Sequence, residues 1–179
     1  MRCKEALPAL ISALGDDVSG PVASEAIKQF GGEATKQLLA AAEPFTEVEV
    51  ESSLRRRRSV IALLLQIADS TALPRDARTR WLADADPAIS VLGARVAFRD
   101  GDAAEKRRAA QRLVGMLPRA NGMGRNDIET CLLSHPNASR QAVQAALPAR
   151  PPAIDDFSAK AAADCVLLRV AQFLHLQRG

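Results

Sequence analysis

The amino-acid sequence predicts an all-α protein made of short, paired helices. Apolar residues account for 47% of the 179 residues, yet aromatic residues account for only 3%. Ala and Leu dominate the apolar set and are strong helix formers, whereas the aromatic residues that favour strands are scarce. The second observation is a helix–turn–helix pattern in residues 7–31 that recurs later in the chain. Together these observations favour helices packed on helices over a β-sheet.

The pattern in residues 7–31 describes two helices joined by a turn. Apolar side chains recur at i, i+3, i+4 and i+7, which is the spacing of one helix face, until Gly15-Asp16-Asp17 interrupts them. Pro21 suits the first turn of a second helix, which Gly31-Gly32 ends. The two apolar stripes consist of Leu7, Leu10, Ile11 and Leu14, and of Val22, Ala23, Ala26, Ile27 and Phe30. Such short helices bury their stripes against each other and against the next pair, so the pattern predicts a stacked array.

The same frame returns 71 residues later, in residues 78–101. The shifted stripe positions are all apolar or small: Trp81, Leu82, Ala85, Ala94, Ala97 and Phe98. Asp86 before Pro87 predicts a capped start for the second helix of this unit. A middle repeat is expected between the two units, with helices over 33–42 and 53–68 and a loop over 43–51. Ala26 and Ala97 would then occupy equivalent, tightly packed helix crossings.

After this third unit the repeat pattern weakens. Asp102 with Glu105 predicts a capping pair that opens the next helix. Residues 118–126 indicate a long turn, after which Asn126 is expected to cap another helix, and Pro136 begins a short one. These segments are interpreted as divergent repeats.

We expect the helical repeats to span residues 1–147, with a clear pattern to about residue 115. A Pro-rich linker follows over 148–153, and the last segment, 154–179, holds an apolar helix expected over 155–177. Its apolar side chains lie on most sides: Phe157, Ala161, Val166, Leu167, Leu168, Val170, Phe173, Leu174 and Leu176. This helix is expected to pack on the array as its cap and to favour self-association.

The segments ALPALISAL and VASEAIKQFGGEATKQLLAA (6–14 and 22–41) resemble a HEAT repeat of the short bacterial type, and RWLADADPAISVLGARVAFRDGD (80–102) resembles a second. The resemblance extends over about the first 115 residues. It implies a right-handed, armadillo-like α-solenoid whose second helices line a concave surface that binds proteins or, less often, nucleic acid. The middle repeat departs from the family by an insertion, and the C-terminal third only approximates the pattern.

The net charge of the chain indicates what class of partner such a surface would bind. The net charge is +3 and the isoelectric point is near 9.0, which permits an acidic partner but falls short of a dedicated nucleic-acid binder. The basic residues expected to make the concave face positive and to bind the partner are Lys28, Arg55, Arg56, Arg95 and Arg99.

The run of four arginines at 55–58 cannot form a single face, because consecutive helical residues lie about 100° apart. The apolar stripe of this helix directs Arg57 and Arg58 toward neighbouring elements, where Glu47, Glu49 or Glu51 would meet them. Arg55 and Arg56 are expected to point away from the chain's own elements.

Two groups of residues suggest a catalytic or a metal site. For both groups we favour a structural role. Trp81 with Asp84 and Asp86 resembles the base-extruding set of HEAT-like DNA glycosylases, yet Trp81 falls on a core position and Asp86 on a cap. Cys131 and His135, at i and i+4, would supply half a metal site, and no second pair has recognisable spacing. We expect no catalytic residue, no metal site and no cofactor.

The sequence therefore predicts a non-catalytic protein-binding or scaffold module. The three scattered cysteines suggest reduced thiols, and the start MRCKEALPAL does not look like a signal peptide, so a cytoplasmic location without membrane contact is expected. The alternatives are a nucleic-acid-binding HEAT-like protein and a HEAT-type lyase or glycosylase-like enzyme.

Overall fold

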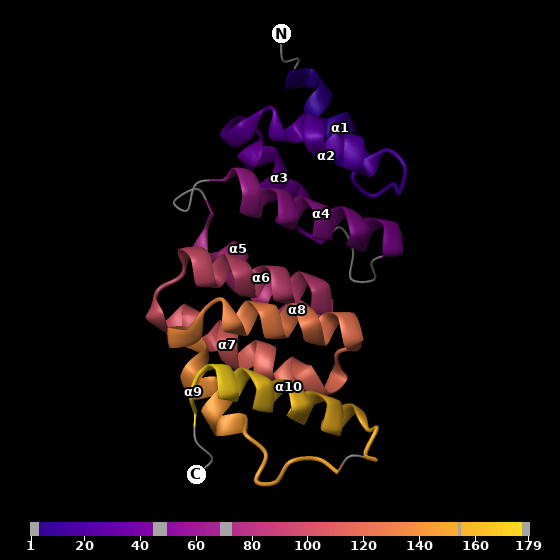
Figure 1. Ribbon diagram of the computed structural model, residues 1–179. Coiled ribbons are helices and arrows are strands. Elements are labelled where there is room, and N and C mark those ends of the chain that lie inside the picture. The colour runs from indigo at the N-terminus through magenta and orange to yellow at the C-terminus, as the bar shows by residue number, and fades with distance from the viewer. Residues whose placement is uncertain (1–3, 45–49, 69–72, 154, 177–179) are drawn as a thin grey trace. The chain divides into compact units, whose positions relative to one another are not determined.

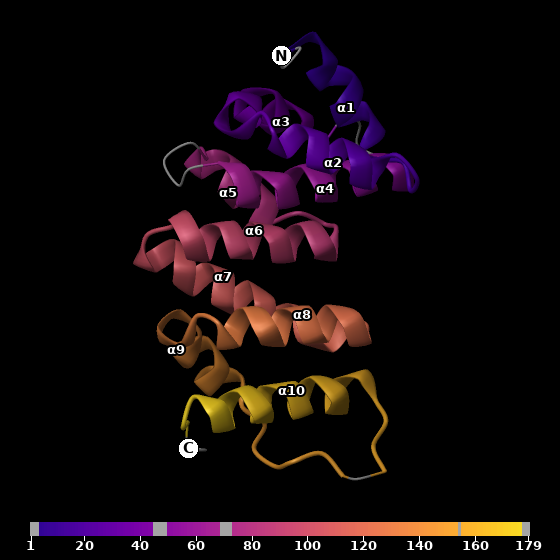
Figure 2. The same cartoon turned by 45° about the horizontal axis from the view of Figure 1, so that its top comes forward.

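The computed structural model describes residues 4–44, 50–68, 73–153 and 155–176. Within these residues all regular structure is helical, so the all-α prediction is confirmed (Figures 1 and 2). The chain divides into two compact units, Met1–Trp81 and Leu82–Gly179. The division falls inside the predicted third repeat, at the C-terminal end of its first helix.

The described residues of the first unit form two helical pairs and one further helix. Helix α1 (Leu7–Ala13) packs on α2 (Gly20–Lys28), and α3 (Thr35–Ala41) packs on α4 (Glu51–Ile67). Helix α1 also contacts α3 and α4, so the two pairs pack on each other. Helix α5 (Arg75–Leu82) follows, and short 3-10 turns span Lys4–Ala6 and Gly31–Ala34.

The predicted stripes form most of the core of this unit. The buried apolar side chains of these pairs include Leu7, Ile11, Leu14, Ala23, Ile27, Phe30, Leu38, Val60, Ile61, Leu63 and Leu64. Gly31 adopts a φ of +55°, a left-handed conformation that suits glycine at the turn after α2. Val22 contradicts the prediction, because its side chain is 72% exposed. It lies on the solvent side of α2, next to Pro21 in the first turn.

The described residues of the second unit form five helices. They are α6 (Pro87–Asp100), α7 (Ala103–Met116), α8 (Gly122–Leu133), α9 (Pro136–Ala146) and α10 (Ala159–Phe173), with a 3-10 turn at Leu117–Arg119. Helix α7 packs between α6 and α9, while α10 contacts α8, α9 and the 3-10 turn. Their apolar faces share one core, to which Phe98, Leu113, Ile128, Leu132, Val143 and Val170 contribute.

The predicted N-caps of α6 and α7 are confirmed. Asp86 accepts a hydrogen bond from the Ile89 backbone N–H at 2.9 Å. Asp102 accepts from the Glu105 N–H at 2.8 Å, while the Glu105 carboxylate accepts from the Asp102 N–H at 3.0 Å, which completes a capping box. These two caps fix the starts of the helices that enclose much of the second core.

The prediction of a long turn over 118–126 is wrong from residue 122 onward. Helix α8 begins at Gly122, and its cap is Asn121, which accepts from the Gly124 N–H at 2.8 Å, rather than Asn126. Two glycines in the first turn conceal this start, because glycine has a low helix propensity. The cap and the burial of Ile128 and Leu132 outweigh that propensity.

The last helix is shorter than predicted. It begins at Ala159, because the Ser158 hydroxyl accepts from the Ala161 N–H at 3.1 Å and caps it there. Phe157 therefore precedes the helix, and its side chain is 92% exposed instead of packed. The described residues from 147 to 158 lie outside any helix.

Candidate functional site

A groove in the first unit contains one of the predicted partner-binding residues, Arg55. It has a volume of about 330 Å³ and lies between the loop that joins α1 to α2 and the exposed side of α4. Its apolar lining comes from Leu14, Pro21, Ala62 and Leu63, and its polar lining includes Asp17, Ser24, Arg55, Ser59 and Gln66. An apolar hollow with a polar rim is the usual form of a binding site.

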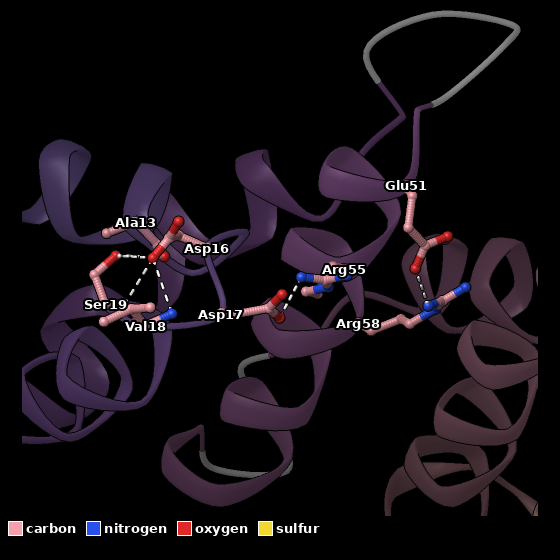
Figure 3. Close-up of polar contacts among 8 residues, drawn as sticks. All are labelled: Ala13, Asp16, Asp17, Val18, Ser19, Glu51, Arg55 and Arg58. Atoms are coloured by element: carbon pink, nitrogen blue, oxygen red, sulfur yellow. Dashed lines mark hydrogen bonds and ion pairs between the residues drawn. The ribbon is translucent and has the colours of Figure 1, made fainter.

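The loop on one side of this groove is organised by Asp16. Its Oδ1 accepts hydrogen bonds from the Ser19 N–H at 2.8 Å, the Val18 N–H at 3.0 Å and the Ser19 hydroxyl at 3.0 Å (Figure 3). The Ser19 backbone bond contributes most to lowering the pKa of the Asp16 carboxyl from its ordinary value of 3.8, because these donors stabilise the charged form. The loop is thus an Asx-type turn held by its own side chain.

The close approach of this loop to α4 requires Gly15. A Cβ added at this position would lie 2.7 Å from the Ser52 carbonyl oxygen and 3.4 Å from the Arg56 Cβ. Real Cβ atoms do not approach a backbone oxygen so closely, so the glycine lets the loop lie against the first turns of α4.

Arg55 connects α4 to the same loop. Its guanidinium forms an ion pair with Asp17, and Figure 3 shows the two side chains meeting across the gap between the elements. The side chains of Arg55 and Asp17 are 38% and 77% exposed, so the pair is screened by solvent and stabilises the fold little. The expectation that Arg55 points away from the chain's own elements is therefore wrong. It lines a groove instead.

Among the other arginines of the run, Arg57 turns toward a neighbouring element, as predicted. Arg57 is buried, and its Nε donates to the Ala42 carbonyl at 3.1 Å, which satisfies an acceptor at the C-terminal end of α3. Arg58 pairs with Glu51 at 2.9 Å (Figure 3). The alternative acceptors Glu47 and Glu49 lie outside the described residues. Glu51 is thus confirmed as a partner of Arg58, although it lies on α4 itself and not on a neighbouring element.

Three of the other predicted partner-binding residues also lie near carboxylates of their own unit. Lys28 pairs with Glu25 at 2.6 Å on α2. In the second unit the Arg95 guanidinium lies 3.9 Å from Asp127, and Arg99 pairs with Asp100 at 2.6 Å. Arg56 is half-buried on α4. The common positive face formed by Lys28, Arg55, Arg56, Arg95 and Arg99 stays a prediction.

The residues considered for catalysis have packing or capping roles. Trp81 is 1% exposed, and the Asp84 carboxylate accepts from the backbone N–H of Asp86 at 2.9 Å. The His135 ring Nδ1 lies 3.0 Å from the Cys131 carbonyl oxygen, so it contacts the backbone of this residue. Burial raises the pKa of the Cys131 thiol to about 11, although the nearby Arg95 opposes the shift. A buried, protonated thiol is a poor nucleophile and metal ligand.

Comparisons with known proteins add no relative: no protein-family model, no curated protein and no solved structure matches this chain. In the part of the chain that the structure describes, no group of three or more His, Cys, Asp or Glu side chains has the arrangement of a metal site. No helix in those ranges has the length and apolarity needed to cross a bilayer.

Sequence reasoning missed the groove but not all of its residues. The loop that borders it carries a recognisable signal, since Asp16 followed by Ser19 is the pattern of a side-chain-stabilised turn. The contribution of Ser59, Ala62 and Leu63 from α4 has no local signal, because it depends on the packing of α4 beside α2.

Proposed function

We propose that this chain is a HEAT-like α-solenoid that binds a protein partner without catalysing a reaction, and that the groove of the first unit receives an acidic segment of that partner. The observation that carries the proposal is the apolar groove with Arg55 on its rim. Exposed apolar side chains lie beside it in the sequence, with Val18 85% and Val22 72% exposed. Apolar side chains grouped at the surface around an arginine are typical of protein interfaces.

The geometry of Arg55 supports an acidic partner. Asp17 holds the guanidinium in an exposed ion pair, and a partner carboxylate can replace it there at small cost because such pairs contribute little in water. Arginine is also enriched among the residues that dominate binding energy. The apolar lining from Leu14, Pro21 and Leu63 would receive a neighbouring apolar side chain of the same segment.

The proposal can be tested with a photo-reactive phenylalanine analogue placed at Val22, in the full-length chain. Irradiation in a lysate of the native host should cross-link one partner through an acid-rich peptide, identified by mass spectrometry. The same analogue at Lys36, which is exposed on α3 and does not line the groove, provides the matched control.

Charge reversal then separates the groove from the surface in general. Arg55→Glu should abolish the cross-link from position 22, whereas Lys36→Glu should leave it unchanged, with both variants keeping the circular dichroism of the wild type. Equal cross-linking in the Arg55→Glu protein would contradict the groove as the binding site.

Self-association through α10 is part of the same proposal. Phe173 supports it, because this side chain is 61% exposed, whereas Val166 and Val170 of the same helix are buried. Light scattering of the wild type should show a concentration-dependent increase in mass that Phe173→Asp removes. A monomer at all concentrations would leave α10 with the capping role alone.

Nucleic-acid binding is the alternative function, and the distribution of charge favours it in the second unit. Residues 1–81 contain 11 basic and 11 acidic side chains, whereas residues 82–179 contain 13 and 10, so the net charge of +3 lies in the second unit. Binding of a random oligonucleotide that weakens steeply with added salt would support this alternative, because neutralised phosphates release counterions.

A further inference from the structure

A second hollow, in the second unit, is not used by the proposed function. It has a volume of about 400 Å³ and lies where the end of α6, the first turns of α7 and the junction of α8 with α9 meet. Its lining includes the rings of Phe98 and His135, the cations Lys106 and Arg107, and the first residues of α9. This volume is in the range of small-molecule sites.

One wall of the hollow is a fixed aromatic stack. The rings of Phe98 and His135 lie 4.3 Å apart between centroids, with planes 9° from parallel. The Cys131 carbonyl oxygen can only accept, so His135 Nδ1 donates to it, and this bond together with the stack holds the imidazole in one orientation. Phe98 is 2% exposed and supports the stack from the core side, whereas His135 is half-buried and lines the hollow.

Positive charge also lines the hollow. Lys106 and Arg107 line it from α7, and neither has a carboxylate partner among the residues that the structure describes. Elsewhere in this unit Arg99 pairs with Asp100 and Arg169 with Glu129. The lining of the hollow, by contrast, contains two cations and no carboxylate.

Two acidic residues that precede Lys106 in the sequence form hydrogen bonds within the capping box. Asp102 and Glu105 exchange hydrogen bonds in the capping box of α7, so their carboxylates are directed to backbone N–H groups. The first turn of α9 adds to the positive potential, since Pro136 starts it and no side chain caps it. An anion in the hollow would meet the two cations without an intervening acid from this capping box.

We propose that this hollow binds a small organic phosphate. The phosphate group contacts Lys106 and Arg107, which supply charge-assisted hydrogen bonds. The apolar body of the ligand lies against the imidazole of His135 and against Ala103, Pro136 and Ala138, which give the hollow a mainly apolar lining. This inference is independent of the groove in the first unit and of its partner.

The full-length chain, labelled with nitrogen-15, can be titrated with phenyl phosphate, with inorganic phosphate and with phenol. We expect phenyl phosphate to shift the amide resonances of Ser134, His135, Asn137 and Ala138 and of the first turns of α7, and to bind about tenfold more tightly than either fragment. Inorganic phosphate that binds as tightly as phenyl phosphate would overturn the assignment of an organic ligand. Phenol that binds as tightly would overturn the role of the cations.

The variants use two neighbouring arginines of α7. Arg107→Glu should weaken phenyl phosphate binding about tenfold, as expected for the loss of a charge-assisted bond. Arg108→Glu makes the same change in net charge at an exposed position that does not line the hollow, and should leave the affinity unchanged. Equal weakening by both variants would show a general charge effect and would overturn the proposal, as would unchanged binding in the Arg107→Glu protein.

Discussion

Two glycine-to-alanine substitutions in the second unit should change its stability in opposite directions. Gly101 connects α6 to α7, and its N–H donates to the Ala97 carbonyl at 2.8 Å. A Cβ at this position would overlap that same carbonyl oxygen and would lie 2.9 Å from the Glu105 Cβ. Gly115 lies near the end of α7 and is exposed, and a Cβ there would meet nothing within 4 Å.

The magnitudes follow from these surroundings. At Gly101 the clash is with backbone, which cannot move without disturbing the end of α6 or the capping box, so Gly101→Ala should cost about 1–3 kcal/mol. At Gly115 the substitution adds helix propensity without a clash, so Gly115→Ala should stabilise the unit by up to about 1 kcal/mol. The two variants should therefore differ by about 1–4 kcal/mol, although the chemical change is identical.

Urea unfolding followed by far-UV circular dichroism measures both variants against the wild type. Amide hydrogen exchange should in addition show faster exchange in α6 and α7 of the Gly101→Ala protein, because these helices meet at the substituted residue. A Gly101→Ala protein as stable as the Gly115→Ala protein would refute the close approach of residue 101 to the end of α6.

Three further predictions concern packing and titration. Ala97 is 2% exposed, so Ala97→Leu should lower the free energy of unfolding by about 1–3 kcal/mol. Ala26 is half-buried, so Ala26→Leu should lower it by less. Equal losses of stability in urea unfolding would contradict this difference in burial. Iodoacetamide should label Cys165, which is exposed, much faster than Cys131, and equal labelling rates in mass spectrometry would argue against the burial of Cys131. Burial raises the pKa of the Cys131 thiol from 9.0 to about 11 in the folded state, so the free energy of unfolding should fall as the pH rises from 9.0 toward 11. The pKa of Asp16 is lowered by folding, so its contribution is present above its ordinary value of 3.8 and is lost as the pH falls through the folded value; acid unfolding of Asp16→Asn should show a weaker pH dependence than the wild type.

The local features of the fold could be predicted because few residues determine them. The caps at Asp86 and Asp102 depend on side chains and N–H groups three residues apart, so the sequence alone locates both helix starts. The start of α8 was missed because a tertiary core stabilises a helix that opens with glycine, against its local propensity. The length of α10 was overestimated because apolar residues continue past the Ser158 cap, which is the physical boundary.

The shift of 71 residues predicts burial correctly in the second helices of the two units but not throughout the first helices. Ala23 and Ala94, related by the shift of 71, are both buried, as are Ile27 and Phe98. In the first helices the shift relates buried Leu14 to Ala85, which is exposed. Apolar composition alone does not distinguish these cases.

The two hollows depend on contacts that are distant in the sequence. Arg55 and Asp17 are 38 residues apart, and their meeting depends on the packing of α4 against the first pair. Similarly, Phe98 and His135 stack although they come from α6 and from the junction before α9. The run of arginines indicates that Arg55 is a candidate binding residue, but only the fold shows that this residue lines a groove.

The connection before α10 makes the second unit suitable for fragment complementation. The described residues from 147 to 158 lie outside helices, and most are exposed, so a protease should cut here first. After cleavage α10 would remain attached only by its buried face and by the bidentate contact of Arg169 with Glu129 on α8, at 2.8 and 2.6 Å. A synthetic peptide of the last helix added to the truncated chain would then convert an intramolecular docking step into a bimolecular one, whose dissociation constant reports how strongly this helix is held.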